Sequence, residues 1–307
     1  MKTDPNLWHK IKNSMVAGHR LARANLSDQL LYEGPNTLLS RAAWIPGMGI
    51  GVKSASILPQ NPAQRGLPTI HGAMVVFDDA TGQVRGTLDS ADITNLKTAC
   101  DSVLGSSLLA RADATRLLII GAGFVAEQLV QAYAALMPHL TQVSLWNRTG
   151  EKAAALVQNL NAMGFAVTQA DDLATACAQA HVISSAVMVQ DPILQGQWVQ
   201  PGTHVDLIGA FTPQMREADD TLLQKSRIFC DCLDTTVDHI GEFMDPIARG
   251  VFKRGDIVGD YYDLIPGKIG RKTATEITLC KNGGGAHLDL MTAVAIGLGE
   301  AESNICV

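Results

Sequence analysis

The chain has 307 residues, of which 47% are hydrophobic and 18% charged, and 24 Lys and Arg against 30 Asp and Glu give a net charge of −6. This composition excludes an intrinsically disordered chain, a coiled coil and a collagen-like repeat. No basic run is long enough to follow a phosphate backbone, and no apolar segment reaches the roughly 20 residues of a bilayer-spanning helix. We therefore expect a cytoplasmic protein of about two domains, with neither a nucleic acid nor a membrane as partner.

The cysteines show no metal-binding or disulfide pattern. Only Cys230 and Cys232 are close together, and no second pair completes a zinc site. We expect reduced thiols and no metal at all six positions, which are Cys100, Cys177, Cys230, Cys232, Cys280 and Cys306.

The first third of the chain predicts an α+β region. Two β-prone runs within residues 69–90 flank the turn Asp78–Gly82, which is typical of an antiparallel hairpin. From Arg116 onward, short apolar strands alternate with helical stretches. This alternation predicts an α/β fold with a doubly wound parallel sheet of the Rossmann type. The predicted strands are residues 116–120, 142–149, 166–169, 181–187, 203–210 and 227–232, and the predicted linker before them is residues 110–115.

A glycine-rich turn follows the first of these strands. Residues 121–126 fit the pattern GxGxxA between a strand and a helix, the context that makes this pattern specific for a dinucleotide. Gly121 permits the tight turn, Gly123 leaves room for the pyrophosphate, and Ala126 lets helix and strand pack closely. The expected cofactor contacts are Gly121, Ala122, Gly123, Phe124 and Val125.

The end of the second strand indicates which dinucleotide binds. An NAD site usually carries Asp or Glu about 20 residues beyond the glycine turn, where this chain has Asn147, Arg148 and Thr149. These side chains suit a 2′-phosphate, which Arg148 can grip through its planar guanidinium. We predict NADPH as the cofactor, with NADH as the alternative.

At this point the chain resembles the ornithine cyclodeaminase/μ-crystallin family. The resemblance runs from about Gly49 to the C-terminus, and the order of its pieces carries it. Those pieces are Gly51-Val52-Lys53, the hairpin with Thr81-Gly82, residues 96–99 with Asp101-Ser102, the glycine turn, Asn147-Arg148-Thr149, and residues 208–213 with Arg216-Glu217.

The family resemblance implies a homodimer with two domains. Residues 1–113 with 284–307 would form the substrate-binding and dimerisation domain, and residues 114–283 the NADP-binding Rossmann domain. Within the Rossmann domain, the expected nicotinamide neighbours lie at the carboxyl ends of the strands and are Ser184, Ser185, Ala186, Lys281 and Asn282, with Gly283 on the substrate side.

The family's two carboxylate-gripping cations fall on Lys53 and Lys97, with Arg41 as a third candidate. The second position is commonly Arg in the family, so Lys97 is a departure that keeps the charge but loses the bidentate geometry. Lys53 is also expected to help control the proton of the substrate imine if burial lowers its pKa.

A second departure concerns Phe211, which stands where cyclodeaminases place an acidic residue. Phe cannot exchange a proton, so ornithine cyclisation is disfavoured. Asp206 is expected to be a buried, hydrogen-bonded carboxylate, and His71 and Asp289 are weaker candidates for a role at the site.

These observations favour an NADPH-dependent imine reductase that converts a cyclic ketimine carboxylate, Δ1-pyrroline-2-carboxylate or Δ1-piperideine-2-carboxylate, to L-proline or L-pipecolate. Three alternatives stay open: an ornithine cyclodeaminase, an alanine dehydrogenase-like enzyme, and a μ-crystallin-like NADPH-dependent binding protein.

Overall fold

The computed structural model describes residues 2–296, which form two compact units. The parallel unit comprises residues 2–9 and Thr98–Gly284, and the antiparallel unit comprises Lys10–Lys97 and residues 285–296. The contacts divide the chain inside helix α3 (Ser90–Leu109), and the segment 110–115 follows the end of this helix. The domain boundary between residues 113 and 114 stays a prediction. Residues 297–307, with Cys306 and the end of the predicted second domain, lie outside the described residues.

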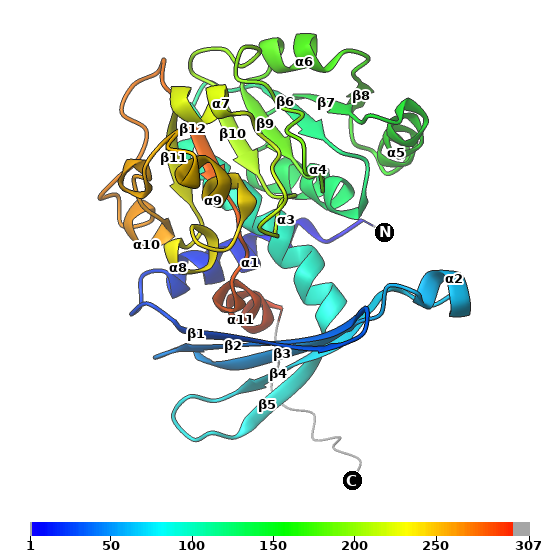
Figure 1. The fold of residues 1–307 in the computed structure, drawn as a ribbon, viewed down its shortest axis with the longest axis vertical. Coiled ribbons are helices and arrows are strands. Elements are labelled where there is room, and N and C mark those ends of the chain that lie inside the picture. Colours follow the sequence, from blue (N-terminus) through cyan, green and yellow to red (C-terminus); the bar gives the residue numbers. More distant parts are fainter. Residues whose placement is uncertain (1, 297–307) are drawn as a thin grey trace. The chain divides into compact units, whose positions relative to one another are not determined.

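The antiparallel unit is built on a five-stranded meander in the order β1-β2-β3-β4-β5 (Figure 1). Its strands are β1 (Asn25–Glu33), β2 (Asn36–Ile45), β3 (Gly49–Ile57), β4 (Ile70–Phe77) and β5 (Val84–Asp89). Its helices are α2 (Asn61–Arg65) and α11 (Ala286–Ala295), and α1 (Pro5–Gly18) and α3 contribute residues to both units.

One face of β3 explains where α11 packs. Gly49, Gly51, Lys53 and Ala55 alternate with more exposed neighbours along the strand, so they share its buried face. A Cβ atom at Gly51 would lie 2.5 Å from Met74 and 3.2 Å from Leu290 of α11. The small residues therefore let α11 approach this face, and α11 contacts β2 and β3 (Figure 1).

The hairpin predicted within residues 69–90 is confirmed as β4 and β5. Asp78 stabilises its turn because its carboxylate accepts hydrogen bonds from Ala80 N, Thr81 N and Thr81 Oγ1. Gly82 has φ +71°, a conformation that favours glycine.

The parallel unit contains a seven-stranded, wholly parallel sheet in the order β11-β12-β10-β9-β6-β7-β8, which confirms the predicted α/β class. Its strands are β6 (Arg116–Ile120), β7 (Gln142–Trp146), β8 (Val167–Gln169), β9 (Val182–Ser185), β10 (His204–Leu207), β11 (Ser226–Cys230) and β12 (Ile277–Lys281). Strand β12 was not among the predicted strands, although it lies between β10 and β11 and all five of its residues are buried.

Helices connect these strands. They are α4 (Phe124–Leu136), α5 (Gly150–Ala162), α6 (Leu173–Gln179), α7 (Asp220–Lys225), α8 (Leu233–Thr236), α9 (Gly241–Ala248), α10 (Tyr261–Leu264) and the 3₁₀ turn η1 (Arg254–Asp256). Aspartates cap three of them: Asp172, Asp219 and Asp260 accept hydrogen bonds from first-turn N–H groups of α6, α7 and α10.

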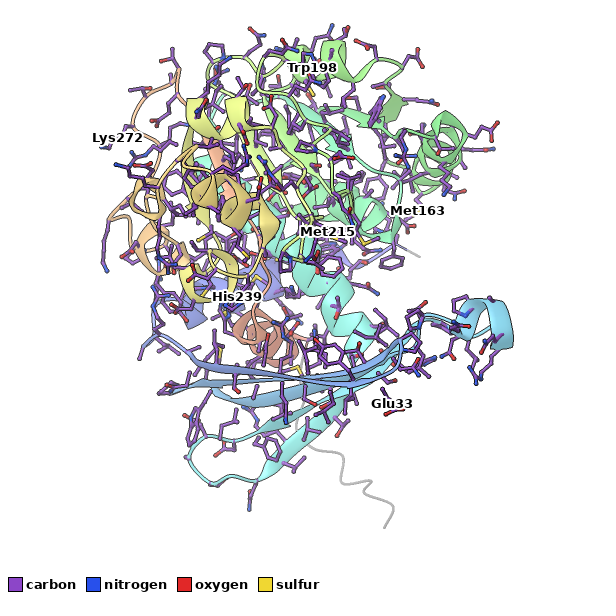
Figure 2. All side chains as sticks on the ribbon, viewed as in Figure 1. Glu33, Met163, Trp198, Met215, His239 and Lys272 are labelled. Carbon is purple, nitrogen blue, oxygen red and sulfur yellow. The ribbon has the colours of Figure 1, made fainter. Side chains whose placement is uncertain are left out.

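Side chains fill the space between the parallel sheet and its helices (Figure 2). The core includes Leu118, Ile120, Ile183, Val205 and Leu279, all fully buried. Between residues 2 and 296, no helix combines the length and apolar character needed to cross a membrane.

Candidate active site

The glycine turn after β6 has the geometry that a dinucleotide needs. Gly121 has φ +120°, and a Cβ atom there would lie 3.0 Å from the carbonyl oxygen of Ala186. Any other residue would therefore be strained and crowded against the segment that follows β9. Ala126 is fully buried, as close packing of helix against strand requires.

The N-terminus of α4 is open where a pyrophosphate would lie. A Cβ atom at Gly123 would meet no atom within 4 Å, and Gly123 offers no side-chain cap to the helix. In the described part of the chain, no group accepts a hydrogen bond from the N–H of Phe124 or Val125. Free N–H groups at a helix N-terminus suit an anion, so this turn fits the diphosphate of a dinucleotide.

The end of β7 carries no carboxylate. Asn147 Nδ2 donates to the carbonyl of Thr149 at 2.9 Å, which shapes the turn into α5. Arg148 and Thr149 are exposed, and Arg148 has no acidic partner among residues 2–296. Its guanidinium is therefore available to an external anion.

Glu217 organises the loops that follow β9 and β10. Its buried carboxylate accepts hydrogen bonds from Val187 N (3.2 Å), Gly209 N (2.6 Å), Ala210 N (3.0 Å) and Ser185 Oγ (2.7 Å). Burial raises the pKa of Glu217 to about 7. The predicted cofactor contact Ser185 thus directs its hydroxyl at Glu217, whereas the Ala186 carbonyl faces the glycine turn.

The side chains of Lys281 and Asn282 also point into the parallel unit. The Lys281 ammonium is fully buried and donates to the carbonyls of Leu207 and Asn282, both at 2.9 Å. Asn282 donates from Nδ2 to Asp206 and accepts from the Tyr261 hydroxyl. The polar groups of both side chains thus have internal partners, and their predicted contacts with the cofactor stay predictions.

Gly283 occupies a position where only glycine fits. A Cβ atom there would lie 2.2 Å from Thr236 Oγ1. The N–H groups of Gly283 and Gly284 both donate to Asp231 Oδ2, at 3.0 Å and 2.6 Å. Its proposed contact with the substrate stays a prediction.

Asp206 is buried and hydrogen-bonded, as expected. It accepts hydrogen bonds from Ser102 Oγ, Ser184 Oγ and Asn282 Nδ2, and burial raises its pKa to about 6. These partners bind it on several sides, so it braces the interior. Phe211, beyond the end of β10, is 57% exposed.

The three predicted cations occur within the antiparallel unit. Arg41 and Lys53 are direct register partners on β2 and β3, and Lys97 lies on α3. Arg41 forms an ion pair with Asp28 at 2.6 Å. Lys53 and Lys97 are only 8% and 7% exposed. Lys97 and Arg41 both lower the pKa of Lys53 by charge repulsion, which indicates that the three charges act on one another.

Two further residues join this group. Asp289 of α11 pairs with Lys53 Nζ at 2.8 Å, and Thr94 Oγ1 accepts a hydrogen bond from the same ammonium at 3.1 Å. Sequence reasoning left Asp289 as a weak candidate and missed Thr94. The i, i+3 spacing of Thr94 and Lys97 on α3 is a signal that places both on one helix face. His71, the other weak candidate, is exposed on β4.

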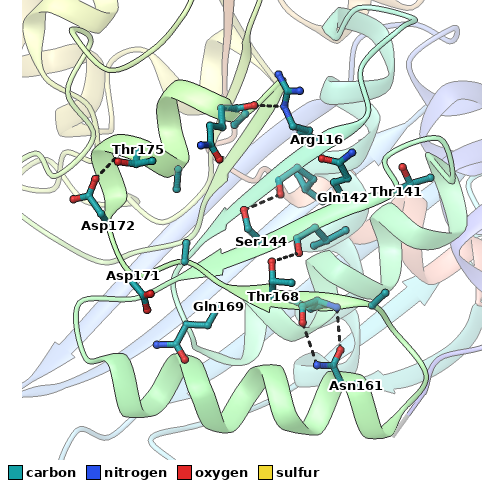
Figure 3. A pocket seen from close by; sticks show the side chains of 18 residues that line it. Arg116, Thr141, Gln142, Ser144, Asn161, Thr168, Gln169, Asp171, Asp172 and Thr175 are labelled. Atoms are coloured by element: carbon teal, nitrogen blue, oxygen red, sulfur yellow. Dashed lines mark hydrogen bonds between the residues drawn. The ribbon is translucent and has the colours of Figure 1, made fainter.

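A hollow of the parallel unit is lined by none of the predicted site residues (Figure 3). It has a volume of about 860 Å³ beside the starts of β6 and β7 and along β8. Several of its polar side chains have internal partners: Asn161 bonds the backbone of Val167, Ser144 that of Leu117, and Asp172 that of Thr175. Because ligands of parallel sheets bind at the carboxyl ends of the strands, this hollow at the opposite end is not the candidate site.

Neither metal ligation nor disulfide formation is indicated in the described range. Residues 2–296 contain no group of three or more His, Cys, Asp or Glu side chains arranged to hold a metal ion. Their five cysteines are buried free thiols.

Comparison with known proteins places these observations in a family. Residues 46–297 match the ornithine cyclodeaminase/mu-crystallin family. A curated relative, the Δ1-pyrroline-2-carboxylate reductase of Paracoccus denitrificans, is 47% identical over 93% of this chain and 90% of its own.

Two solved structures share the fold. The Δ1-pyrroline-2-carboxylate reductase of Thermococcus litoralis, in complex with NADH and L-proline, superposes with a TM-score of 0.85 at 21% identity, over 95% of this chain and 92% of its own. The iminosuccinate reductase of Paracoccus denitrificans, in complex with NAD+, gives 0.86 at 25% identity, over 96% and 91%. With its glycine turn, its cation group and the match over residues 46–297, the chain belongs to the ornithine cyclodeaminase/mu-crystallin family.

Proposed function

We propose that the protein is an NADPH-dependent reductase of a cyclic ketimine carboxylate, with Δ1-pyrroline-2-carboxylate as the first substrate to test. The observation that carries the proposal is Lys97. Lys97 is only 7% exposed as a residue, and no acidic side chain among residues 2–296 pairs with it. A buried cation without a partner is costly, so its natural partner is a bound anion. The 47% identical relative carries the name of this reductase, which supports the same choice.

The cation group, which comprises Arg41, Lys53 and Lys97, suits a carboxylate substrate. Arg41 pairs with Asp28 and Lys53 pairs with Asp289. Lys97 has no acidic partner among residues 2–296, so a substrate carboxylate can supply one.

The residues of this chain would act mainly by position and charge. Lys97 and Lys53 would bind the substrate carboxylate and fix the orientation of the ring, and Thr94 would hold the Lys53 ammonium. When bound, the nicotinamide supplies the hydride that reduces the carbon of the C=N bond. A protonated imine is already electrophilic, so no acidic residue is needed to expel ammonia.

The cofactor preference rests on the end of β7. Exposed Arg148 and Thr149, with no carboxylate beside them, favour a 2′-phosphate over a free ribose diol. NADH stays the alternative, because the two similar solved structures hold NADH and NAD+.

Phe211 argues against an ornithine cyclodeaminase. Its exposed ring has no group that can take a proton from a substrate amine. A binding protein of the μ-crystallin kind would hold the same ligands, so only the measurement of turnover distinguishes it from a reductase.

The assay mixes purified protein with NADPH and Δ1-pyrroline-2-carboxylate, and separately with ornithine and NAD. We expect rapid loss of the nicotinamide absorbance in the first mixture and no ammonia in the second. Binding of both ligands without turnover would favour the binding protein, and ammonia release would favour the lyase. Oxaloacetate with ammonia, a source of iminosuccinate, serves as the dicarboxylate comparison.

We also propose a cytoplasmic homodimer. The apolar side chains of Leu31, Leu38 and Trp44 share one face of β1 and β2 and are exposed in the single chain, and a second copy packed on this face would cover them. Sedimentation equilibrium tests the dimer, and a monomer at micromolar concentration would contradict it. The buried free thiols of residues 2–296 fit a reducing compartment.

A further inference from the structure

Lys53 has an environment that should oppose its positive charge. Its ammonium is almost removed from water, and burial is the main cause that lowers its pKa below the ordinary value. Arg41 on β2 and Lys97 on α3 act in the same direction by charge repulsion. The neighbour on β4 is Met74, which has no charge. A lysine in such surroundings tends to lose its proton.

Asp289 is the one acidic side chain that opposes this tendency in the described residues around Lys53. Its carboxylate is fully buried, lies 2.8 Å from Lys53 Nζ, and acts to raise the pKa of Lys53. It also belongs to the first turn of α11, where the helix dipole favours a negative charge.

The other titratable group of this turn does not compensate. His287 is fully buried, and burial with repulsion from His19 and Lys97 lowers its pKa well below the ordinary value. It is therefore neutral near pH 7 and adds no positive charge beside Lys53. Asp289 acts here without competition from a protonated histidine.

We propose that Asp289 is a positioning residue, which keeps Lys53 as an ammonium ion and directs it to the substrate carboxylate. The proposal rests on the function proposed above. It gives Asp289 no contact with substrate or cofactor. Thr94 completes the arrangement, since its hydroxyl accepts from the same ammonium and donates to the carbonyl of Ser90 at 2.8 Å.

The test is the pH dependence of binding and of turnover in Asp289→Asn. Without the carboxylate, the pKa of Lys53 falls further, so the ammonium form is lost at a lower pH. We expect the alkaline limb of kcat/KM for Δ1-pyrroline-2-carboxylate to move to lower pH, and the ratio of kcat/KM at pH 9 to that at pH 7 to fall by about tenfold. Asp289→Glu, which keeps the charge, should restore most of the wild-type profile.

Binding gives a second measurement that needs no turnover. Pyrrole-2-carboxylate is a planar ring carboxylate that cannot accept a hydride in this reaction. Its affinity for the protein with NADPH bound can be measured by isothermal titration calorimetry at several pH values. The affinity should fall as the pH rises, and this fall should occur at a lower pH in Asp289→Asn than in wild type. If Asp289→Asn does not fold, Asp289→Ser, which also removes the charge, replaces it and should show the same shift.

Asp263→Asn is the matched control. It removes the carboxylate of an exposed Asp–Lys pair, Asp263 with Lys268 at 3.2 Å, and should leave both pH profiles unchanged. Equal profiles for wild type and Asp289→Asn would overturn the role of Asp289. Failure of the wild type to reduce the imine or bind the analogue would overturn the proposed function instead.

Discussion

The two units differ in how their buried charges are paired. In the parallel unit, the buried carboxylates of Glu217, Glu242, Asp206 and Asp231 accept from backbone N–H groups or from hydroxyl and amide side chains. The buried Lys281 ammonium of the same unit donates to two backbone carbonyls. The antiparallel unit buries the ammonium groups of Lys53 and Lys97, of which only the first has a carboxylate partner in residues 2–296.

This contrast separates structural charges from functional ones. A fully hydrogen-bonded buried charge holds loops in place and needs nothing from outside. A buried charge that lacks a partner gains its stabilisation only when a ligand arrives. Removing a charge of the first kind should therefore reduce stability, and removing one of the second kind should reduce binding and turnover.

The largest expected effect is that of Lys53→Met. Losing one ammonium of the carboxylate clamp should lower kcat/KM for Δ1-pyrroline-2-carboxylate by about 10³-fold, because a buried charge-assisted contact is worth several kcal/mol. The affinity for NADPH, measured by fluorescence titration, should change little. If this variant kept wild-type activity, Lys53 would not be a charge that acts in substrate binding, and the contrast drawn between the two units would fail.

Glu217→Gln should act on stability. We expect the free energy of unfolding, measured with urea at pH 5, to fall by about 3 kcal/mol, because the Gln side chain puts an NH2 donor where the wild-type carboxyl oxygens accept from buried N–H groups. Glu151→Gln, at an exposed position of α5, is the control and should change little.

The pH dependence of this deficit has a definite sign. The folded Glu217 carboxyl ionises only near pH 7, whereas in the unfolded chain it ionises near its ordinary value. Folding therefore binds a proton between these values, and wild-type stability falls as pH rises through this window, by on the order of 3 kcal/mol. Gln cannot ionise, so the deficit of the variant should be smaller at pH 8 than at pH 5. A growing deficit would contradict the raised pKa.

Arg148→Ala sharpens the comparison within the cofactor site. The KM for NADPH should rise by about tenfold while the KM for NADH stays within about twofold, because only NADPH offers a 2′-phosphate to the guanidinium. Parallel changes for both cofactors would show that Arg148 does not select the phosphate.

Lys97→Arg should have the smallest effect. The charge is kept and the bidentate geometry usual in the family is restored, so we expect kcat/KM to change by no more than about threefold. Lys97→Met, by contrast, should resemble Lys53→Met. If Lys97→Met keeps full activity, the unpartnered ammonium is not the carboxylate receptor.

Local signals in the sequence were sufficient for the fold class and the glycine turn. Gly121 has a positive φ, and the four apolar residues 117–120 form a buried strand. Both features can be predicted from residues that are adjacent in the sequence. Strand β12 was missed because the predicted strands alternate with helices, whereas a loop of twelve residues separates β12 from the short helix α10 before it. The division by contacts falls inside the continuous helix α3, where no turn residue could mark it in the sequence.

Side-chain direction was harder to predict than chain path. Ser185, Lys281 and Asn282 follow parallel strands at the expected edge, yet their polar groups point to Glu217, to backbone carbonyls and to Asp206. The side-chain partners Glu217 and Asp206 lie far away in the sequence. The same limit hid the Lys53–Asp289 pair, since it joins β3 to the last described helix.

The register of β2 with β3 has a consequence for how this family can vary in length. Arg41 lies opposite Lys53 because the turn between Ile45 and Gly49 fixes the pairing. A single-residue insertion that moved β3 by one position would turn Lys53 outward and send Val52 or Ser54 toward α11. Length changes in this turn should therefore be tolerated only in steps of two residues, even though the turn itself lies outside the cation group.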